Sequence, residues 1–341
     1  SGAAFAGLIS TQALFPYALD KWFGLSGTWF LLFGGVILIV TLIQNPEGVA
    51  GAFYRRTHRR PTFRPELGGQ GGFPAGASAM VPSSAPRGEP EPSGPPVLAV
   101  TGLSVAFGGV HALSEVDLQV GEGELLGLIG PNGAGKTTLI DAITGFVSCT
   151  GRVELDGRDV RPLAPYERAR LGFARTWQGT DLFDDLDVRE NLMVAAGSAV
   201  AVSKGGPGGL EGTLAEMGLE PIAPALPSEL SEGQRKLVGL ARAVVAGPRL
   251  LCLDEPAAGL DTEESRVLGR RLRGLADRGV STLLIDHDMG LVLSICDRVV
   301  VLEFGRVIAN DVPEVVRRDP AVVAAYLGTA ATPARAVDPA T

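Results

Sequence analysis

Three scarcities narrow the classes of protein to which this 341-residue chain can belong. Lysine occurs only four times, and 30 basic residues face 38 acidic ones, which leaves a net charge of -8. Because nucleic-acid binders usually carry a basic surface, we expect no nucleic-acid partner. The three cysteines form neither a CxxC pair nor a metal-like cluster, which predicts free thiols in a reducing compartment. A basic leader with a cleavage site is also lacking, so no signal peptide is expected.

Charged residues are missing altogether from the apolar run 25–43. This length is close to the ~20 residues that a helix needs to cross a bilayer. Trp22 and Trp29 lie near one end, and the arginines of 55–60 follow the other, which predicts that the second end is cytoplasmic. Residues 1–60 are therefore expected to be a transmembrane segment. A buried core helix is the alternative.

The rest of the chain divides by composition into a linker, a globular domain and a tail. Residues 61–96 are rich in Pro, Gly and Ser and bury too little apolar surface to order themselves, so a flexible linker is expected. Residues 329–341 are expected to be a disordered tail. Between them, 97–328 alternate short apolar strands with helical stretches. This pattern predicts an α/β domain with a parallel or mixed sheet flanked by helices.

Within this domain the sequence predicts five strands and a helical subdomain that covers residues from about 179 to 240. The expected strands are 98–105, 125–129, 250–253, 282–285 and 298–302.

A glycine-rich loop lies between one of these strands and a helix start. Strand 125–129 runs into Gly130-Pro131-Asn132-Gly133-Ala134-Gly135-Lys136-Thr137, which is the pattern of a phosphate-binding loop in its confirming context. The glycines let backbone N–H groups turn toward phosphate oxygens, and the following helix adds its positive end. Lys136 is expected to reach the β- and γ-phosphates of ATP, and the Thr137 hydroxyl to ligate Mg²⁺. A chance glycine-rich turn is the alternative, which the strand-loop-helix context disfavours.

Two acidic residues follow strand 250–253. Asp254 can hold magnesium through water, and Glu255 can accept a proton from the attacking water or orient it. Two acidic residues that open a turn before Pro256 would be a common feature by themselves. Because they follow a phosphate loop in the sequence, a catalytic role for these two acidic residues is favoured over a simple turn.

Ser231 precedes a helix that is expected over 235–245. It is predicted to be the N-cap, with Glu232 and Gln234 in the first turn. Capping is by itself a sufficient explanation of this serine.

Taken in order, these strings resemble the nucleotide-binding domain of ATP-binding cassette (ABC) proteins over residues 97–328. The resemblance implies catalytic roles for Glu255 and His287 and magnesium contacts from Thr137, Gln178 and Asp254. Glu232 departs from the glycine that is usual in the family. The resemblance further implies that ATP is contacted by Phe107, Gly130, Pro131, Asn132, Gly133, Ala134, Gly135, Lys136, Thr137, Thr138, Gln178, Ser231, Gly233, Gln234 and Asp261.

In this family two such domains dimerise head to tail. Ser231 of one domain would then face the γ-phosphate bound by the other, since a helix N-terminus is an anion site. The alternative for His287 is an ordinary loop histidine, which its position between Asp286 and Asp288 after a buried strand disfavours.

A narrower resemblance is carried by residues 107–113, 173–178, 286–289 and 315–328. These strings look like the ATPase subunits of branched-chain amino-acid importers, and 25–60 look like the last transmembrane helix of the matching permease. The resemblance implies an ATP-hydrolysing importer subunit fused to the C-terminal end of a permease, with the upstream helices outside this sequence.

The implied partners are permease transmembrane subunits, a second ABC ATPase domain, an extracytoplasmic solute-binding protein and the membrane. The implied place is the cytoplasmic membrane of a bacterium, with the ATPase domain in the cytoplasm. Trp177, Phe183 and Leu186 are candidate contacts with the membrane subunit, or simply core residues. An importer of urea or amides and a soluble ABC ATPase in DNA repair or translation are the alternatives. A degenerate cassette without turnover is disfavoured by Glu255 and His287.

Overall fold

The computed structural model describes residues 94–177, 182–198 and 209–328. The expected transmembrane segment, the tail, Gln178 and all of the expected linker except residues 94–96 lie outside these residues. In the part of the chain that is described, no helix is long and apolar enough to cross a membrane.

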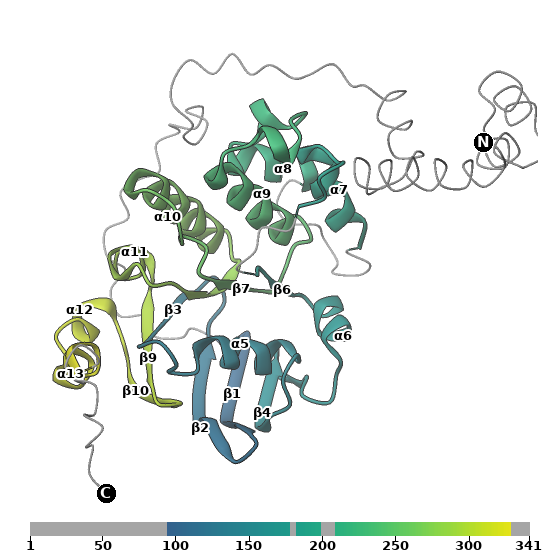
Figure 1. The fold of residues 1–341 in the computed structure, drawn as a ribbon. Helices are drawn as coiled ribbons and strands as arrows, with labels where there is room; N and C mark the ends of the chain where they lie inside the picture. The colour runs from purple at the N-terminus through teal and green to yellow at the C-terminus, as the bar shows by residue number, and fades with distance from the viewer. Residues whose placement is uncertain (1–93, 178–181, 199–208, 329–341) are drawn as a thin grey trace, which may run out of the picture. The chain divides into compact units, whose positions relative to one another are not determined.

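A six-stranded sheet forms the centre of the domain, in the order β10-β9-β3-β8-β7-β6 (Figure 1). Five of its strands are parallel, and β10 pairs antiparallel with β9 at one edge. Every residue of β3, β7 and β8 is buried, which is the pattern of a parallel sheet covered on both faces. The bounds are β3 (Leu125–Ile129), β6 (Phe173–Arg175), β7 (Leu250–Asp254), β8 (Ser281–Ile285), β9 (Arg298–Glu303) and β10 (Arg306–Asp311).

A second sheet is antiparallel, in the order β2-β1-β4-β5. Its strands are β1 (Leu98–Phe107), β2 (Val110–Val120), β4 (Thr150–Leu155) and β5 (Arg158–Asp159). The sequence predicted a single parallel or mixed sheet, so the separate antiparallel sheet that contains residues 98–105 was not expected. Gly108 and Gly109, both at positive φ, join β1 to β2 in two residues, and so short a link permits only an antiparallel pair.

The helices fall into three groups. The first group contains α5 (Lys136–Thr144), which follows the phosphate loop, and α6 (Pro165–Arg170), which follows the last strand of the antiparallel sheet. A helical part contains α7 (Val188–Ser198), α8 (Gly209–Met217) and α9 (Glu232–Val244), which together occupy the predicted helical subdomain and extend beyond it by four residues. The remaining helices are α10 (Thr262–Asp277), α11 (Met289–Ile295), α12 (Pro313–Val316) and α13 (Pro320–Gly328).

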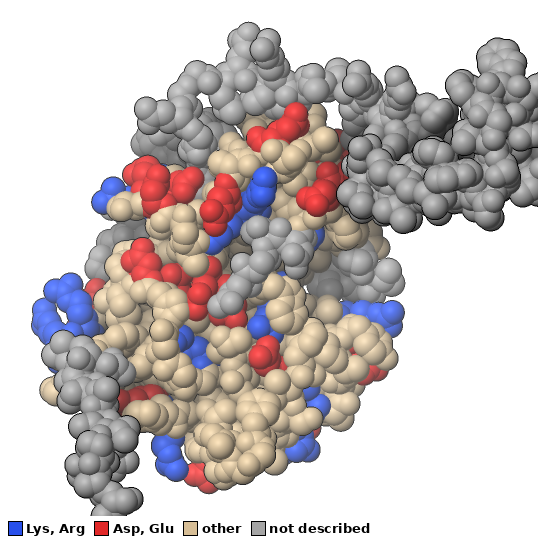
Figure 2. Space-filling model, viewed as in Figure 1, with Lys and Arg blue, Asp and Glu red and all other residues tan. Residues whose placement is uncertain are grey.

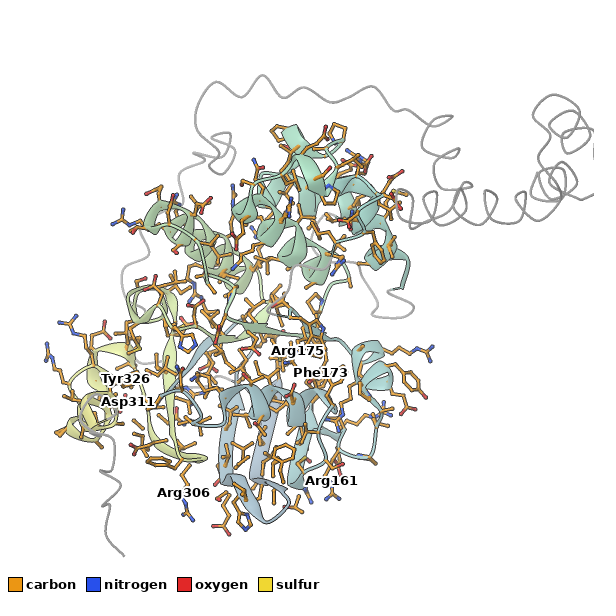
Figure 3. The ribbon with its side chains drawn as sticks, viewed as in Figure 1. Arg161, Phe173, Arg175, Arg306, Asp311 and Tyr326 are labelled. Atoms are coloured by element: carbon orange, nitrogen blue, oxygen red, sulfur yellow. The ribbon has the colours of Figure 1, made fainter. Side chains whose placement is uncertain are left out.

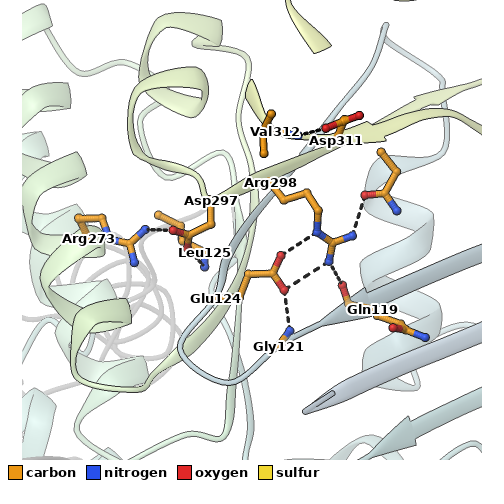
Figure 4. Close-up of polar contacts among 10 residues, drawn as sticks. Gln119, Gly121, Glu124, Leu125, Arg273, Asp297, Arg298, Asp311 and Val312 are labelled. Carbon is orange, nitrogen blue, oxygen red and sulfur yellow. Dashed lines mark hydrogen bonds and ion pairs between the residues drawn. The ribbon is translucent and has the colours of Figure 1, made fainter. Parts of the chain in front are cut away.

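A polar network ties the two sheets together near the start of β3 (Figure 4). Arg298 of β9 donates to Glu124 at 2.9 Å and to the Gln119 carbonyl of β2 at 2.7 Å. Asp297 accepts from Arg273 of α10 at 2.8 Å and from the Leu125 backbone N–H at 2.9 Å. Strand β3 is therefore held at its entry by contacts from both sheets and from α10.

The far end of α5 is fixed by a buried arginine. Arg168 of α6 donates to the carbonyls of Ala142 and Ile143 at 2.9 and 2.6 Å. These are last-turn carbonyls of α5, and a cation at a helix C-terminus also interacts favourably with the helix dipole. The helix that follows the phosphate loop is thus secured at the end away from the loop.

Candidate nucleotide site

The phosphate loop starts directly where β3 ends, and glycine is required at both of its ends. Gly130 has a φ of 151°, and a Cβ there would lie 2.1 Å from the Leu302 carbonyl oxygen. Gly135 has a φ of 103°, and a Cβ there would lie 2.8 Å from the Ala112 carbonyl oxygen. A side chain at either position would collide with backbone, so the loop can keep this path only with glycine.

Lys136 begins α5 and folds back over the loop. Its side chain is buried, at 8% exposure, and its Nζ donates to the carbonyls of Gly130 at 2.7 Å and Pro131 at 3.0 Å. Burial lowers the pKa of Lys136, while Glu255 and Asp254 raise it. Because an ammonium has three donors, at least one remains for a phosphate oxygen.

Asp254 ends β7 inside the protein, at 3% exposure. Its Oδ2 lies 3.5 Å from Arg175 Nη2, while Oδ1 is buried with no hydrogen-bond partner among the described residues. Burial raises the pKa of this carboxyl, and Arg175 and a hydrogen bond from the Thr137 side chain lower it. An unpartnered carboxylate oxygen beside a hydroxyl fits the oxygen ligands that Mg²⁺ takes.

A magnesium ion in such a site is usually held by one or two carboxylates together with water and substrate phosphates. The described residues contain no group of three or more His, Cys, Asp or Glu that could hold a metal. The Asp254 carboxylate and the Thr137 hydroxyl fit this kind of donor set. Gln178, the third predicted ligand, lies outside the described residues.

Glu255 and His287 meet at the edge where β7 and β8 end. The strands pair in register, with Asp254 opposite Ile285, and the Glu255 N–H donates to the Ile285 carbonyl at 2.8 Å. His287 Nε2 lies 2.5 Å from Glu255 Oε1. Glu255 has a φ of 53°, which is an unfavourable conformation for a residue with a side chain and is found preferentially at functional sites.

The loop that carries His287 is held by the buried carboxylate of Asp286. Its two oxygens accept the N–H groups of Ala257 and Asp288, each at 2.9 Å. Asp288 in turn caps α11 by accepting from the Leu291 N–H at 3.0 Å. The position of His287 is therefore set by backbone hydrogen bonds on both sides of it.

The residues predicted to contact a nucleotide from the start of α9 bond within their own helix. The Ser231 hydroxyl accepts from the Gln234 N–H at 3.2 Å, and the Gln234 side chain accepts from the Ser231 N–H at 3.0 Å. The predicted N-cap is therefore confirmed, although α9 begins at Glu232 and not at 235.

The start of α9 packs against the segment that leads into α10. A Cβ at Gly233 would lie 2.5 Å from Glu264 Oε1, and a Cβ at Gly259 would lie 3.0 Å from Glu232 Oε1. Asp261 caps α10 by accepting the N–H groups of Glu263 and Glu264, both at 2.8 Å. The acidic side chain at Glu232 therefore lies against its own chain.

Aromatic residues that the sequence singled out lie on the surface. Phe107, at the end of β1, is 52% exposed. Trp177 and Phe183 are also about half exposed, which excludes the core alternative for both, while Leu186 is partly buried.

Two residues near the site carry no assigned role in the sequence-based prediction. Arg175 ends β6, beside β7 (Figure 3). Its guanidinium bridges Asp254 and Asp141. Tyr326 of α13 makes a hydrogen bond with the Gly130 backbone, and burial raises its pKa while that bond lowers it. A role for Arg175 could have been predicted from the sequence, because parallel strands end at one edge of a sheet and Arg175 ends the strand beside that of Asp254. No local sequence pattern predicts that Tyr326 lies near Gly130.

The charge pattern of the face shown in Figure 2 is mixed. Acidic side chains gather over α10, where Asp261, Glu263 and Glu264 lie, and this face carries no continuous band of Lys and Arg among the described residues. The expectation of no nucleic-acid partner stays a prediction.

The loop, the buried lysine and an aspartate two strands away define the class of P-loop nucleotide hydrolases. Comparison with known proteins narrows this class. The family profile described as ABC transporter matches residues 113–258, and one described as Branched-chain amino acid ATP-binding cassette transporter matches 306–332.

Individual relatives agree with these profiles. The high-affinity branched-chain amino acid transport ATP-binding protein BraF of Pseudomonas aeruginosa is 39% identical over 254 residues, which cover 69% of this chain and 99% of BraF. LivG of Salmonella typhimurium, described in the same words, is 39% identical over 252 residues, covering 69% and 99%. The sulfate/thiosulfate import ATP-binding protein CysA 2 of Chromobacterium violaceum is 38% identical over 238 residues, covering 68% and 64%.

Among solved structures, the ADP conformation of MJ1267, an ATP-binding cassette of an ABC transporter, aligns with a TM-score of 0.61 and 29% identity. The alignment covers 69% of this chain and all of MJ1267. The chain belongs to the ABC transporter family of ATP-binding proteins, and it is an ATPase of that family.

Proposed function

We propose that this chain is the ATP-hydrolysing subunit of an importer for branched-chain or related amino acids, coupling ATP binding and hydrolysis to transport across the cytoplasmic membrane. The observation that carries the proposal is the meeting of Lys136, Asp254, Glu255 and His287 at the edge where β3, β7 and β8 end. These residues supply a phosphate contact, a metal ligand and a general base from one sheet edge.

ATP would be bound by the loop and by the start of α5. The backbone N–H groups of residues 132–138 and the positive end of the helix favour phosphate, and Lys136 adds a charged donor. Thr137 and Asp254, together with Gln178, would hold Mg²⁺, which when bound neutralises charge on the phosphates. Phe107, exposed at the end of β1, would stack on the adenine.

Hydrolysis would depend on Glu255 and His287. Glu255 would accept the proton of the attacking water, a contribution that is typically about 10²- to 10⁴-fold in rate. His287, 2.5 Å from Glu255, would orient the glutamate and contact the γ-phosphate. The unfavourable backbone conformation of Glu255 supports a functional role for it.

Ser231, Gly233, Gln234 and Asp261 would complete the site of a second ABC ATPase domain. Ser231 is partly exposed at the N-terminus of α9, and a helix N-terminus suits an anion supplied by a partner. The capping bonds of Ser231 and Asp261 keep both helix starts fixed for that contact.

The solute is supported by the relatives and not by the ATP site. The family profile over 306–332, BraF and LivG favour branched-chain amino acids. CysA 2, at similar identity, serves sulfate or thiosulfate according to its description, so the ATPase domain alone does not choose a solute. Urea, amides and other amino acids are therefore tested as alternative solutes in the transport experiment described below.

We further propose that residues 25–43 span the membrane as the last helix of a fused permease, with a solute-binding protein and further permease subunits as partners. Their uncharged composition and the arginines of 55–60 support this. The expected result is that full-length protein stays in the membrane pellet after a carbonate wash. Release without detergent would contradict the span while leaving the ATPase assignment intact.

The chemistry is tested with Glu255→Gln in the full-length chain. We expect the variant to bind a fluorescent ATP analogue like the parent and to lose turnover, because the amide cannot accept the proton. The measurement is phosphate release beside equilibrium nucleotide binding. Hydrolysis at the parental rate would show that Glu255 is not the base.

The dimer is tested by mixing a Lys136→Ala chain with a Ser231→Arg chain. In a head-to-tail dimer, one composite site carries both defects and the other carries neither, so activity should partly recover over either homodimer. If the natural pair is a heterodimer, the mixture is made with that second subunit. No recovery, with dimers verified, would place Ser231 outside a shared site.

Transport is tested in vesicles that contain the chain, its permease subunits and the solute-binding protein. ATP-dependent uptake of labelled leucine, isoleucine or valine is expected, and it should stop with Glu255→Gln. Uptake of urea or an amide in place of these amino acids would show that the proposed solute is wrong, while the importer function would stand.

A further inference from the structure

Arg175 lies between the carboxylate of Asp254 and an exposed pair of aromatic rings. Its side chain is 7% exposed; Nη1 bonds Asp141 of α5 at 2.5 Å, and Nη2 lies 3.5 Å from Asp254 Oδ2. On the other side, its guanidinium carbon lies 4.0 Å from the centre of the Trp177 ring. One planar cation therefore touches the end of β7, the helix after the phosphate loop and the segment that follows β6.

The aromatic side of this arrangement is open to solvent. Trp177 and Phe146 pack edge to face, with ring centres 4.9 Å apart and an angle of 82°, and both are more than half exposed. Arg175 also lies 5.9 Å from the Phe146 ring centre. A guanidinium over a tryptophan face is a favourable pair, and it holds the ring in one orientation.

Arg175, its neighbour Thr176 and its ion-pair partner Asp254 each have a buried polar atom without a hydrogen-bond partner within the described ranges. In the described part of the chain, four buried side-chain atoms lack a hydrogen-bond partner, and three of them belong to Arg175, Thr176 and Asp254. Buried polar groups are normally paired, so such a concentration marks a place where a ligand or water completes the bonding. The Arg175 Nε has no hydrogen-bond partner among the described residues, so its guanidinium has a donor that is not used.

We propose that Arg175 is a positioning residue for Asp254, and that it links occupancy of the Asp254 site to the Trp177–Phe146 pair. The inference rests on the proposed role of Asp254 as a magnesium ligand. Because the guanidinium is a rigid plane with fixed donor directions, a shift of Asp254 toward a bound metal moves or tilts the plane over Trp177. Conversely, a partner that binds Trp177 would fix the Arg175 side chain, and through it the position of the Asp254 carboxylate.

Lysine cannot replace Arg175 in this role. An ammonium is a point charge without a plane, so it can pair with one carboxylate but cannot also stack and reach a second one in fixed geometry. Arg175→Lys should thus retain part of the effect on Asp254 and lose the link to the ring, whereas Arg175→Gln should lose both.

The experiment uses residues 1–341 with Glu255→Gln, which stops turnover, and with Trp22→Phe and Trp29→Phe. Within these residues Trp177 is then the one tryptophan, since they contain three. Mn²⁺ is titrated in the presence of ATP, with bound metal measured by electron paramagnetic resonance and Trp177 emission measured in parallel. In the parent we expect the emission to change along the same binding curve as the metal.

Arg175→Gln should raise the Mn²⁺ concentration at half-saturation about tenfold, the lower end of the usual cost of losing a partner that orients a metal ligand. Arg175→Lys should raise it by less and abolish the emission change. The matched control is Arg170→Gln, because Arg170 also lies over an aromatic ring, Tyr166 at 5.6 Å, on the surface of α6. It should change neither curve.

Two results would overturn the proposal. One is that Arg175→Gln leaves the Mn²⁺ concentration at half-saturation unchanged, and the other is that Trp177 emission does not change when the parent binds metal. If Arg175→Gln does not fold, Arg175→Lys decides, since an emission change equal to that of the parent contradicts the link. Failure of the parent to bind Mn²⁺ with ATP would instead overturn the proposed function. The two failures are therefore distinguishable.

Discussion

The two sheets of this protein bury their residues in different ways and contribute differently to the site. β3, β7 and β8 of the six-stranded sheet are buried at every position, whereas β1 and β2 of the antiparallel sheet place many residues at the surface. The phosphate loop, Asp254, Glu255 and His287 all follow strands of the first sheet. The second provides one exposed aromatic residue, Phe107.

The difference follows from how each sheet is connected. Parallel strands end at a common edge, so residues far apart in sequence meet there, and helices cover both faces. Antiparallel strands turn back after two residues, so their ends alternate and no single edge collects side chains. The central sheet therefore concentrates the site's charged residues at one edge, and the other sheet carries Phe107.

The largest effect is expected where the six-stranded sheet meets phosphate. Lys136→Ala should weaken ATP binding about 100-fold or more, because a buried charged donor is removed. Equilibrium binding of a fluorescent ATP analogue measures this. The control is Arg152→Ala on β4, whose exposed pair with Glu154 should contribute little. Equal losses in the two variants would contradict the contrast between the sheets.

A smaller effect is expected on folding. Leu284→Ala removes a fully buried side chain from β8 and should cost about 3 kcal/mol of unfolding free energy. Thr101→Ala, at an exposed position of β1, should cost less than about 0.5 kcal/mol. Urea unfolding followed by circular dichroism compares them. Similar midpoints would show that burial in the central sheet does not set stability.

The smallest effect is expected at the surface of the antiparallel sheet. Phe107→Ala should weaken ATP binding about threefold to tenfold, the value of one aromatic contact, and leave the maximal rate unchanged. The dependence of hydrolysis rate on ATP concentration separates the two quantities. Val110→Ala, another exposed residue of the same turn, is the control. A fall in maximal rate for Phe107→Ala would place this residue in the chemistry and not in binding.

Several features could be predicted from the sequence because they depend on neighbouring residues. Strand Leu125–Ile129 has the predicted bounds, and the glycine loop follows it as expected. Ser231 is the N-cap that the capping pattern predicts. Asp254 lies at the end of β7, as the change from an apolar run to acidic residues predicts.

Local pattern failed where pairing partners decide the outcome. The alternation in 98–107 shows a strand but not which strand it joins, and the two-residue turn at Gly108 and Gly109 gives it an antiparallel partner. The predicted span 235–245 of α9 starts three residues late, although Ser231, Glu232 and Gln234 were recognised as its N-cap and first turn.

The sequence by itself determined the loop, the strand that precedes it and the order of the acidic and histidine residues after it, because each is encoded within a few neighbouring positions. Tertiary structure alone decided that Glu255 meets His287 and that Arg175 bridges Asp141 and Asp254. Arg175 and Asp141 are 34 residues apart, and nothing local records the distance between them in space. That distance is set by strand order and register, which bring separate segments to one edge of the central sheet.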